Sequence, residues 1–248
     1  LLPIISIVIF AAIVWVAAPV SANSPEHTIP TDALRPISQE AAEEAHEAIY
    51  PLLAYATFLS TPTWAADINC KEFLNLPVPP QKALAHAETN VLIEKVRQLR
   101  SAIVKPLEAV RSKCENASFF ERLPYEWVSA RTAEGQKAAS QAKNLFEALR
   151  QIAPPRGVQV AMRPQGDSDF VTYSHVNGYA CPVVNTPSIS YPSSVNLASS
   201  DWFALARRGD WLLVWAPKPI YYGLEVMWVK RDDFKTLPKE SDALLAVP

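Results

Sequence analysis

One segment near the C-terminus constrains the fold more than any other part of the sequence. Between Trp211 and Trp215, two tryptophans and a leucine alternate with Leu212 and Val214. Successive side chains of a strand point to opposite faces, so neither face of a strand formed here is polar. Each buried tryptophan removes about 150–250 Å² from water, and two exposed ones would favour aggregation. We therefore predict that both faces of this strand are covered.

The residues around this strand predict a small all-β unit. Short apolar runs follow Pro154-Pro155, and clusters of turn-forming residues at 164–169, 185–192 and 199–201 separate them. Five strands at such spacing are typical of a small barrel or sandwich. The five runs are Val158–Met162, Phe170–Tyr173, Trp202–Ala206, Trp211–Trp215 and Leu224–Val229.

The residues before the double proline predict α-helices. Apolar residues recur there at steps of three and four over three long stretches, which is typical of helices packed side by side. The first helix is expected to begin near Ser38, a good N-cap residue type, and Pro51 is expected to kink it. The other two are predicted over about Gln81–Lys113, with a second kink at Pro106, and about Ala130–Ile152.

The first 22 residues indicate export. Residues 1–20 carry no charge, and Val20-Ser21-Ala22 supplies small residues for signal-peptide cleavage before Asn23. The same segment is also long enough to be retained as a membrane anchor. Burial as a core helix is a third interpretation. The first two share one consequence, which is that the chain leaves the cytoplasm.

These patterns together predict an α+β multidomain chain with an N-terminal hydrophobic helix, an antiparallel α-helical bundle and a C-terminal β-barrel. The predicted parts are a signal peptide or transmembrane anchor at 1–22, a linker at 23–37, the bundle at 38–153, the barrel at 156–237 and a tail at 238–248.

Three cysteines are compatible with an exported protein. A disulfide between Cys70 and Cys114 would staple the helical region in an oxidising compartment. A straight helix from Pro80 to Cys114 would be roughly 50 Å long. The loop that carries Cys70 must therefore run back along this helix to bring the two Cα atoms within about 7 Å. The sequence leaves this pairing open, and it predicts that Cys181 is a buried free thiol.

The C-terminal strands resemble the closing half of bacterial SH3-like domains. In that family a G-x-W-x-x-V strand precedes a G-W-V strand and a short terminal turn, and Gly209–Val214 and Met227–Phe234 match this pattern. Cys181–Pro187 and Tyr191-Pro192 stand where the family has its N-V-R-x-G-P and Y-P opening, although Met227 replaces the family's glycine. The similar region is under a quarter of the chain. The resemblance implies an SH3-like β-barrel that binds peptidoglycan or a protein partner without catalysis.

Aromatic residues near the apolar strand are the candidate binding residues. Cover from the protein's own helices would make them part of the core, whereas an uncovered face would be a docking groove rimmed by Pro217-Lys218-Pro219. The candidates are Trp202, Trp215, Tyr221 and Tyr222.

Catalytic and metal-binding patterns are weak. The four histidines show no ligand spacing. Cys181 lies six residues after His175, but it lacks the sequence context of a cysteine peptidase. With a net charge of −2, the chain has no basic excess for nucleic acid. We expect no enzyme activity, no cofactor, no metal and no nucleic-acid partner.

The predicted function is therefore binding or scaffolding in the bacterial cell envelope. The expected partner is peptidoglycan or an envelope protein, and the expected location is the periplasm or the periplasmic face of the inner membrane. The alternative is an accessory structural subunit of a membrane protein complex, anchored by the N-terminal helix. An envelope hydrolase or its regulator is a third class.

Overall fold

A computed structural model describes most of the chain beyond its first 33 residues. The described residues are 34, 37–61, 69–82, 84, 90–116, 125–155, 158–162, 175–192, 202–216, 225–235 and 245–246. The predicted export segment, nearly all of the predicted linker and the predicted strand at 170–173 lie outside them. Within the described part of the chain, no helix has the length and apolarity needed to cross a bilayer.

The helices are α1 (Gln39–Ser60), α3 (Cys70–Leu74), α4 (Asn90–Asn116) and α5 (Tyr125–Ile152). The Ser38 hydroxyl accepts a hydrogen bond from the Ala41 amide at 3.2 Å, which confirms the predicted N-cap. The predicted starts of the other two long helices were wrong. Residues 81 and 82, which follow Pro79-Pro80, are not helical, and α5 begins at Tyr125 before the predicted Ala130.

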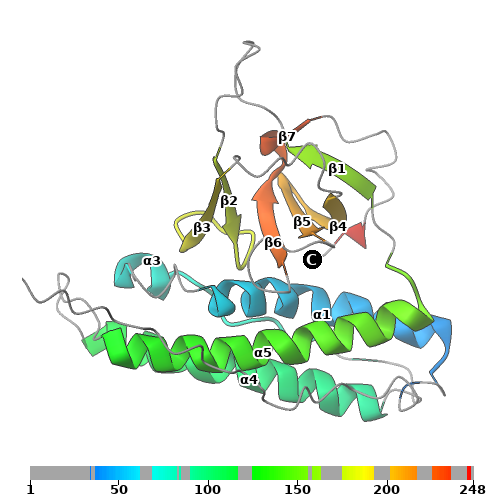
Figure 1. The fold of residues 1–248 in the computed structure, drawn as a ribbon, viewed down its shortest axis with the longest axis horizontal. Helices are drawn as coiled ribbons and strands as arrows, with labels where there is room; N and C mark the ends of the chain where they lie inside the picture. The colour runs from blue at the N-terminus through cyan, green and yellow to red at the C-terminus, as the bar shows by residue number, and fades with distance from the viewer. Residues whose placement is uncertain are drawn as a thin grey trace, which may run out of the picture.

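Helix α1 lies at the centre of the molecule. Figure 1 shows α1, α4 and α5 side by side, with the β-sheet on the α1 side of this bundle. Most α1 residues are buried, as expected for a helix with neighbours on several sides. Leu59 of α1 approaches Gly135 of α5, and the His46 ring of α1 meets Phe146 of α5 edge-on, so these two helices are antiparallel.

The contact between α1 and α5 is close because Gly135 has no side chain. A Cβ atom at Gly135 would lie 2.3 Å from the Leu59 carbonyl oxygen and 2.7 Å from the Leu59 Cβ. Buried alanines extend this face of α5 at Ala138, Ala139 and Ala142. Small residues therefore set the spacing of the two helices.

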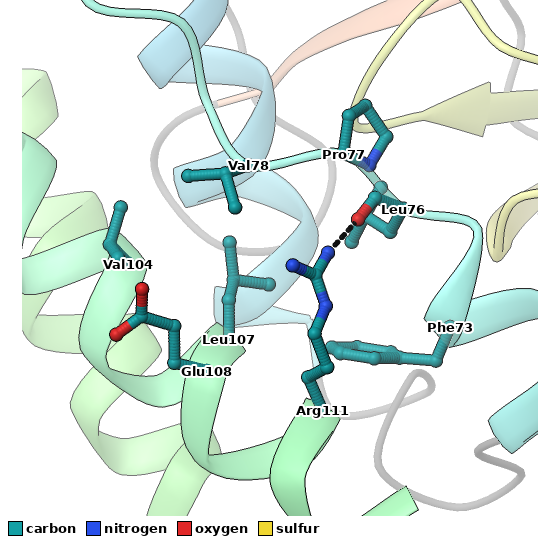
Figure 2. A pocket seen from close by; sticks show the side chains of 8 residues that line it. All are labelled: Phe73, Leu76, Pro77, Val78, Val104, Leu107, Glu108 and Arg111. Carbon is teal, nitrogen blue, oxygen red and sulfur yellow. Dashed lines mark hydrogen bonds between the residues drawn. The ribbon is translucent and has the colours of Figure 1, made fainter. Parts of the chain in front are cut away.

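The Cys70–Cys114 disulfide is present and joins the start of α3 to the end of α4, with a Cα–Cα distance of 5.1 Å. The chain does run back along α4, as this pairing requires. We call its extended segment, Leu76–Pro80, the strap. Arg111 donates a hydrogen bond to the Leu76 carbonyl (Figure 2), and Arg100 donates one to the Pro79 carbonyl at 3.2 Å. The Tyr55 hydroxyl of α1 donates to the Pro77 carbonyl at 2.7 Å.

The strap packs closely on α4. Figure 2 shows Val78 and Leu76 of the strap facing Leu107 and Arg111 of that helix, with Phe73 of α3 beside them. The cavity between these residues has a volume of only about 10 Å³. Such a space holds at most about one water molecule, so this contact serves packing.

The β-region is one sheet of short strands. They are β1 (Val158–Met162), β2 (His175–Tyr179), β3 (Ser188–Pro192), β4 (Trp202–Arg208), β5 (Trp211–Ala216), β6 (Glu225–Lys230), β7 (Phe234–Lys235) and β8 (Leu245–Ala246). Their order is β3-β2-β6-β5-β4-β1-β7 with antiparallel pairing, and β8 adds to β4 in parallel.

The predicted barrel is observed only as an antiparallel sheet. Its outermost strands, β3 and β7, do not pair with each other among the described strands, so the sheet is not closed. The prediction also missed the β2–β3 hairpin and assigned residues 185–192 to a turn, although β3 occupies Ser188–Pro192. Asn185, with a φ of 60°, does lie in the connection before that strand.

Strand β5 meets the main expectation. All six residues from Trp211 to Ala216 are buried, which confirms that both faces of this strand are covered. It follows β4 through a tight turn at Gly209, whose φ of 55° suits the first position of a type II′ hairpin turn. The sheet is joined to the bundle by a buried hydrogen bond of 3.1 Å, which the Val226 amide donates to the Thr57 hydroxyl.

Gly135→Ala should destabilise the fold, because the added methyl group would force α1 and α5 apart. We expect a loss of about 1–3 kcal/mol in the free energy of unfolding, as for other overpacked cores. Urea unfolding measures it, with Gln136→Ala at the exposed neighbouring position as the control. A gain of about 1 kcal/mol, as expected for alanine in place of an exposed helical glycine, would contradict this packing.

Removing the disulfide should also destabilise the protein. For the sequence separation of 44 residues, chain entropy predicts a loss of about 4 kcal/mol in the double variant Cys70→Ala/Cys114→Ala. Thermal unfolding of the wild type with and without reductant provides the comparison. The reduced wild type should have the same melting temperature as the double variant. Equal melting temperatures for oxidised and reduced wild type would show that the bridge does not stabilise the fold.

Candidate functional site

A groove lies where the C-terminal end of α5 meets the sheet. Its volume is about 410 Å³, within the range of about 300–1,000 Å³ that is usual for small-molecule sites. Helix α5 and the residues just after it form one wall, and strands β4 and β5 form the other. The lining residues are Arg150, Gln151, Pro154, Pro155, Phe203, Leu205 and Trp215. We call this the Trp215 groove.

Trp215 is held from several sides and is only 8% exposed. The Phe146 ring of α5 meets its indole edge-on at 5.1 Å between centroids, and Phe203 lies beside it at 5.8 Å. The Arg150 guanidinium lies over the indole, 5.2 Å from its centroid, which is a cation–π contact. The protein's own helix therefore covers much of this tryptophan, and the part that remains lines the groove.

Arg150 is the charged group of the groove. Its Nε and Nη2 atoms donate to Glu147 Oε2 at 3.0 and 2.6 Å. This ion pair is exposed and so contributes little to stability, but it orients the guanidinium toward Trp215. A guanidinium has five N–H donors, so two bonds to Glu147 leave donors for a ligand acceptor.

His46 supports the groove from within the bundle. Its Nε2–H donates to the Ala153 carbonyl at 2.8 Å, and its ring meets the Phe146 ring edge-on, at 5.5 Å between centroids. Ala153 directly precedes the two groove prolines, so this bond ties their end of α5 to α1. His46 is only 3% exposed, and burial lowers the pKa of its imidazole below 6.5.

Among the four sequence-predicted binding residues, the structure describes the side chain of Trp215 alone. Trp215 lines the groove. Trp202 begins β4 in register with Val160 of β1, but its side chain lies outside the described part of the chain, as do Tyr221 and Tyr222. The binding roles of these residues stay predictions.

Sequence reasoning missed Arg150 and Phe203. Phe203 could have been identified, because it is an aromatic residue of the predicted strand Trp202–Ala206, which lies next to the predicted strand that contains Trp215. Arg150 could not have been identified, since an arginine three residues after Glu147 is ordinary on an exposed helix face.

Cys181 is a buried free thiol, as predicted. Burial raises the pKa of this thiol, while the nearby hydroxyls of Tyr55 and Thr186 oppose the increase. A thiol that stays protonated at neutral pH is a poor nucleophile. In the residues that the structure describes, no three histidine, cysteine or acidic side chains are grouped to hold a metal ion.

Comparison of the chain with protein-family models, curated proteins and solved structures found no match.

The buried imidazole predicts that stability falls as the pH falls below 6.5. The unfolded chain protonates His46 at its ordinary pKa, whereas the folded chain resists this, so protonation favours unfolding by about 1.4 kcal/mol per unit of pKa difference. His46→Gln retains a donor for the Ala153 carbonyl and removes the titration. Urea unfolding at pH 7.5 and 5 should show a smaller loss for this variant than for the wild type. Equal losses would show that His46 does not titrate differently on unfolding.

Proposed function

We propose that this protein is a non-catalytic binding protein of the bacterial cell envelope, and that its ligand is peptidoglycan, bound in the Trp215 groove. The observation that carries the proposal is the lining of this groove. Two aromatic rings, two prolines and one arginine face a space of about 410 Å³. Mostly apolar walls with a few oriented polar groups are typical of ligand sites.

Peptidoglycan has the chemistry to match this lining. The C–H faces of its sugar rings pack on flat apolar surfaces such as the partly buried Phe203 ring, beside the small exposed part of Trp215. The carboxylates of its peptide stems are acceptors for the donors of Arg150 that Glu147 does not use. The Gln151 side chain is a further donor and acceptor for the acetamido groups.

The resemblance to bacterial SH3-like domains supports the same proposal. Gly209 provides the turn before β5, whose tryptophan and valine belong to the family's first motif. Strand β6 contains the second motif, and the 3₁₀ turn Arg231–Asp233 follows it directly, in the place of the family's short terminal turn. We therefore propose an SH3-like module for the region from β2 to β7.

The disulfide supports the proposed location. Disulfides persist in oxidising compartments such as the periplasm and are rare in the cytosol. The Cys70–Cys114 bridge joins two elements of the bundle and leaves Cys181 reduced and buried. It agrees with export directed by the apolar segment at 1–22.

An apolar surface patch favours the second candidate, an accessory subunit of an envelope complex. The patch consists of Leu74 at the end of α3 and Val183-Val184 before β3, which are 40%, 36% and 56% exposed. Asn75 donates a hydrogen bond to the Asn185 carbonyl at 3.2 Å and so holds the two segments together. Grouped apolar side chains at a surface often mark protein contacts.

Arg150→Ala should weaken binding to purified peptidoglycan about tenfold, because hydrogen bonds to charged groups contribute roughly 1.5–3 kcal/mol. Co-sedimentation with isolated sacculi measures the binding. The matched control is Arg97→Ala on α4, since Arg97 also pairs with a glutamate three residues earlier, at 2.7 Å. Phe203→Ala should weaken binding as well.

Equal effects of the two arginine variants would contradict a role for the Trp215 groove. A wild-type protein that fails to sediment with sacculi, but co-purifies with a membrane protein in detergent, would favour the accessory subunit. In that case Val184→Ser should release the partner and Arg150→Ala should not.

A further inference from the structure

A second groove lies in the helical region, and its described lining includes no residue of the sheet. It is bounded by α1, by the first half of α4 and by the last residue of the strap with the chain just after it, and its volume is about 210 Å³. The lining residues are Ala48, Leu52, Pro80, Gln81, Lys82, Leu84, Ile93, Val96, Arg97 and Arg100. We call it the α1–α4 groove.

The floor and walls of the α1–α4 groove are apolar. Ala48 and Leu52 form a buried floor from α1, while Ile93, Val96 and Leu84 are partly buried around it. An alkyl chain in this space would replace water against aliphatic side chains, which is favourable in proportion to the apolar area covered.

The rim of this groove is positively charged. It carries three cations, of which Lys82 pairs with Glu47, and Arg97 with Glu94. Arg100 donates Nε–H to the neutral Pro79 carbonyl at 3.2 Å, and no ion pair joins it to a carboxylate in the described part of the chain. Among the described residues one positive charge is therefore left over, on the partly buried Arg100, whose remaining guanidinium donors suit an anionic group.

The size of the groove limits its ligand. It is far larger than the one-water cavity of about 10 Å³ under the strap, so it is not an ordinary packing gap. It is also smaller than the roughly 300–1,000 Å³ typical of drug-sized ligand sites. A single unbranched chain fits these dimensions better than a fused ring system or a two-chain lipid.

We propose that the α1–α4 groove binds a free single-chain carboxylate, a medium-chain fatty acid, with the chain against Leu52 and Val96 and the carboxylate on Arg100. This proposal does not depend on the Trp215 groove or on peptidoglycan binding.

Isothermal titration of the full chain with hexanoate, octanoate and decanoate tests the proposal. Each added methylene should tighten binding about fourfold, from about 0.8 kcal/mol per buried CH₂, until the groove is filled. Octanol and methyl octanoate should bind at least about tenfold more weakly than octanoate, because they lack the charge that Arg100 pairs with.

Two variants locate the site. Arg100→Gln should reduce octanoate affinity about tenfold and leave octanol affinity unchanged. Ile93→Phe should reduce the affinity for both, because the larger ring occupies the groove. Lys105→Gln, at an exposed position of the same helix outside both grooves, is the control and should bind octanoate as the wild type does. If Arg100→Gln does not fold, Arg100→Lys replaces it in the test. This variant keeps the positive charge but lacks the planar guanidinium, so it should retain part of the octanoate affinity.

Three results would overturn the proposal. The first is no saturable binding of any of the carboxylates by the wild type. The second is equal affinity for octanoate and octanol. The third is binding to vesicles of anionic phospholipid without binding to octanoate, which would indicate a membrane surface as the ligand. Loss of octanoate binding would leave peptidoglycan sedimentation unaffected, so the two proposals fail separately.

Discussion

The burial of β5 on both faces is the constraint on which the rest of the structure depends. A strand whose two faces are apolar must lie between two layers, and the helical bundle is one of them. Trp215 accordingly meets Phe146 of α5, and the β6 amide of Val226 meets the α1 hydroxyl of Thr57. These contacts join residues that are about 70 and 170 positions apart, so sheet and bundle stabilise each other.

Periodicity in the sequence was enough to predict most of the long elements, because their apolar residues recur at the spacing of the element they form. It predicted a helical region, a following antiparallel sheet and the positions of β1, β4, β5 and β6 to within a few residues. It failed where local residue types oppose the element they form. The β2–β3 hairpin contains Asn177 and Gly178 in one strand and Pro192 in the other, so cross-strand pairing, which sequence does not show, decides its structure.

The candidate site was predictable only in part, for a related physical reason. Trp215 could be identified from the sequence because both faces of its strand are apolar, which is not expected of a sheet with one face in water. Arg150 and His46 gain their roles from contacts across elements, with Trp215 in one case and with the Ala153 carbonyl in the other. Nothing local distinguishes them from ordinary helix residues. Closure of the sheet likewise depends on register and curvature, which apolar runs do not specify.

The shapes of the two grooves are fixed by different contacts. Pro80 forms part of the wall of the α1–α4 groove, and Arg100 donates a hydrogen bond to the carbonyl of its neighbour Pro79. Both prolines belong to the strap, which the Cys70–Cys114 bridge holds near α4. The shape of the α1–α4 groove therefore depends on oxidation. The Trp215 groove depends on the close α1–α5 contact at Gly135 and on His46, neither of which involves a cysteine. A reducing environment would thus loosen the wall of one groove and leave the aromatic contacts of the other in place.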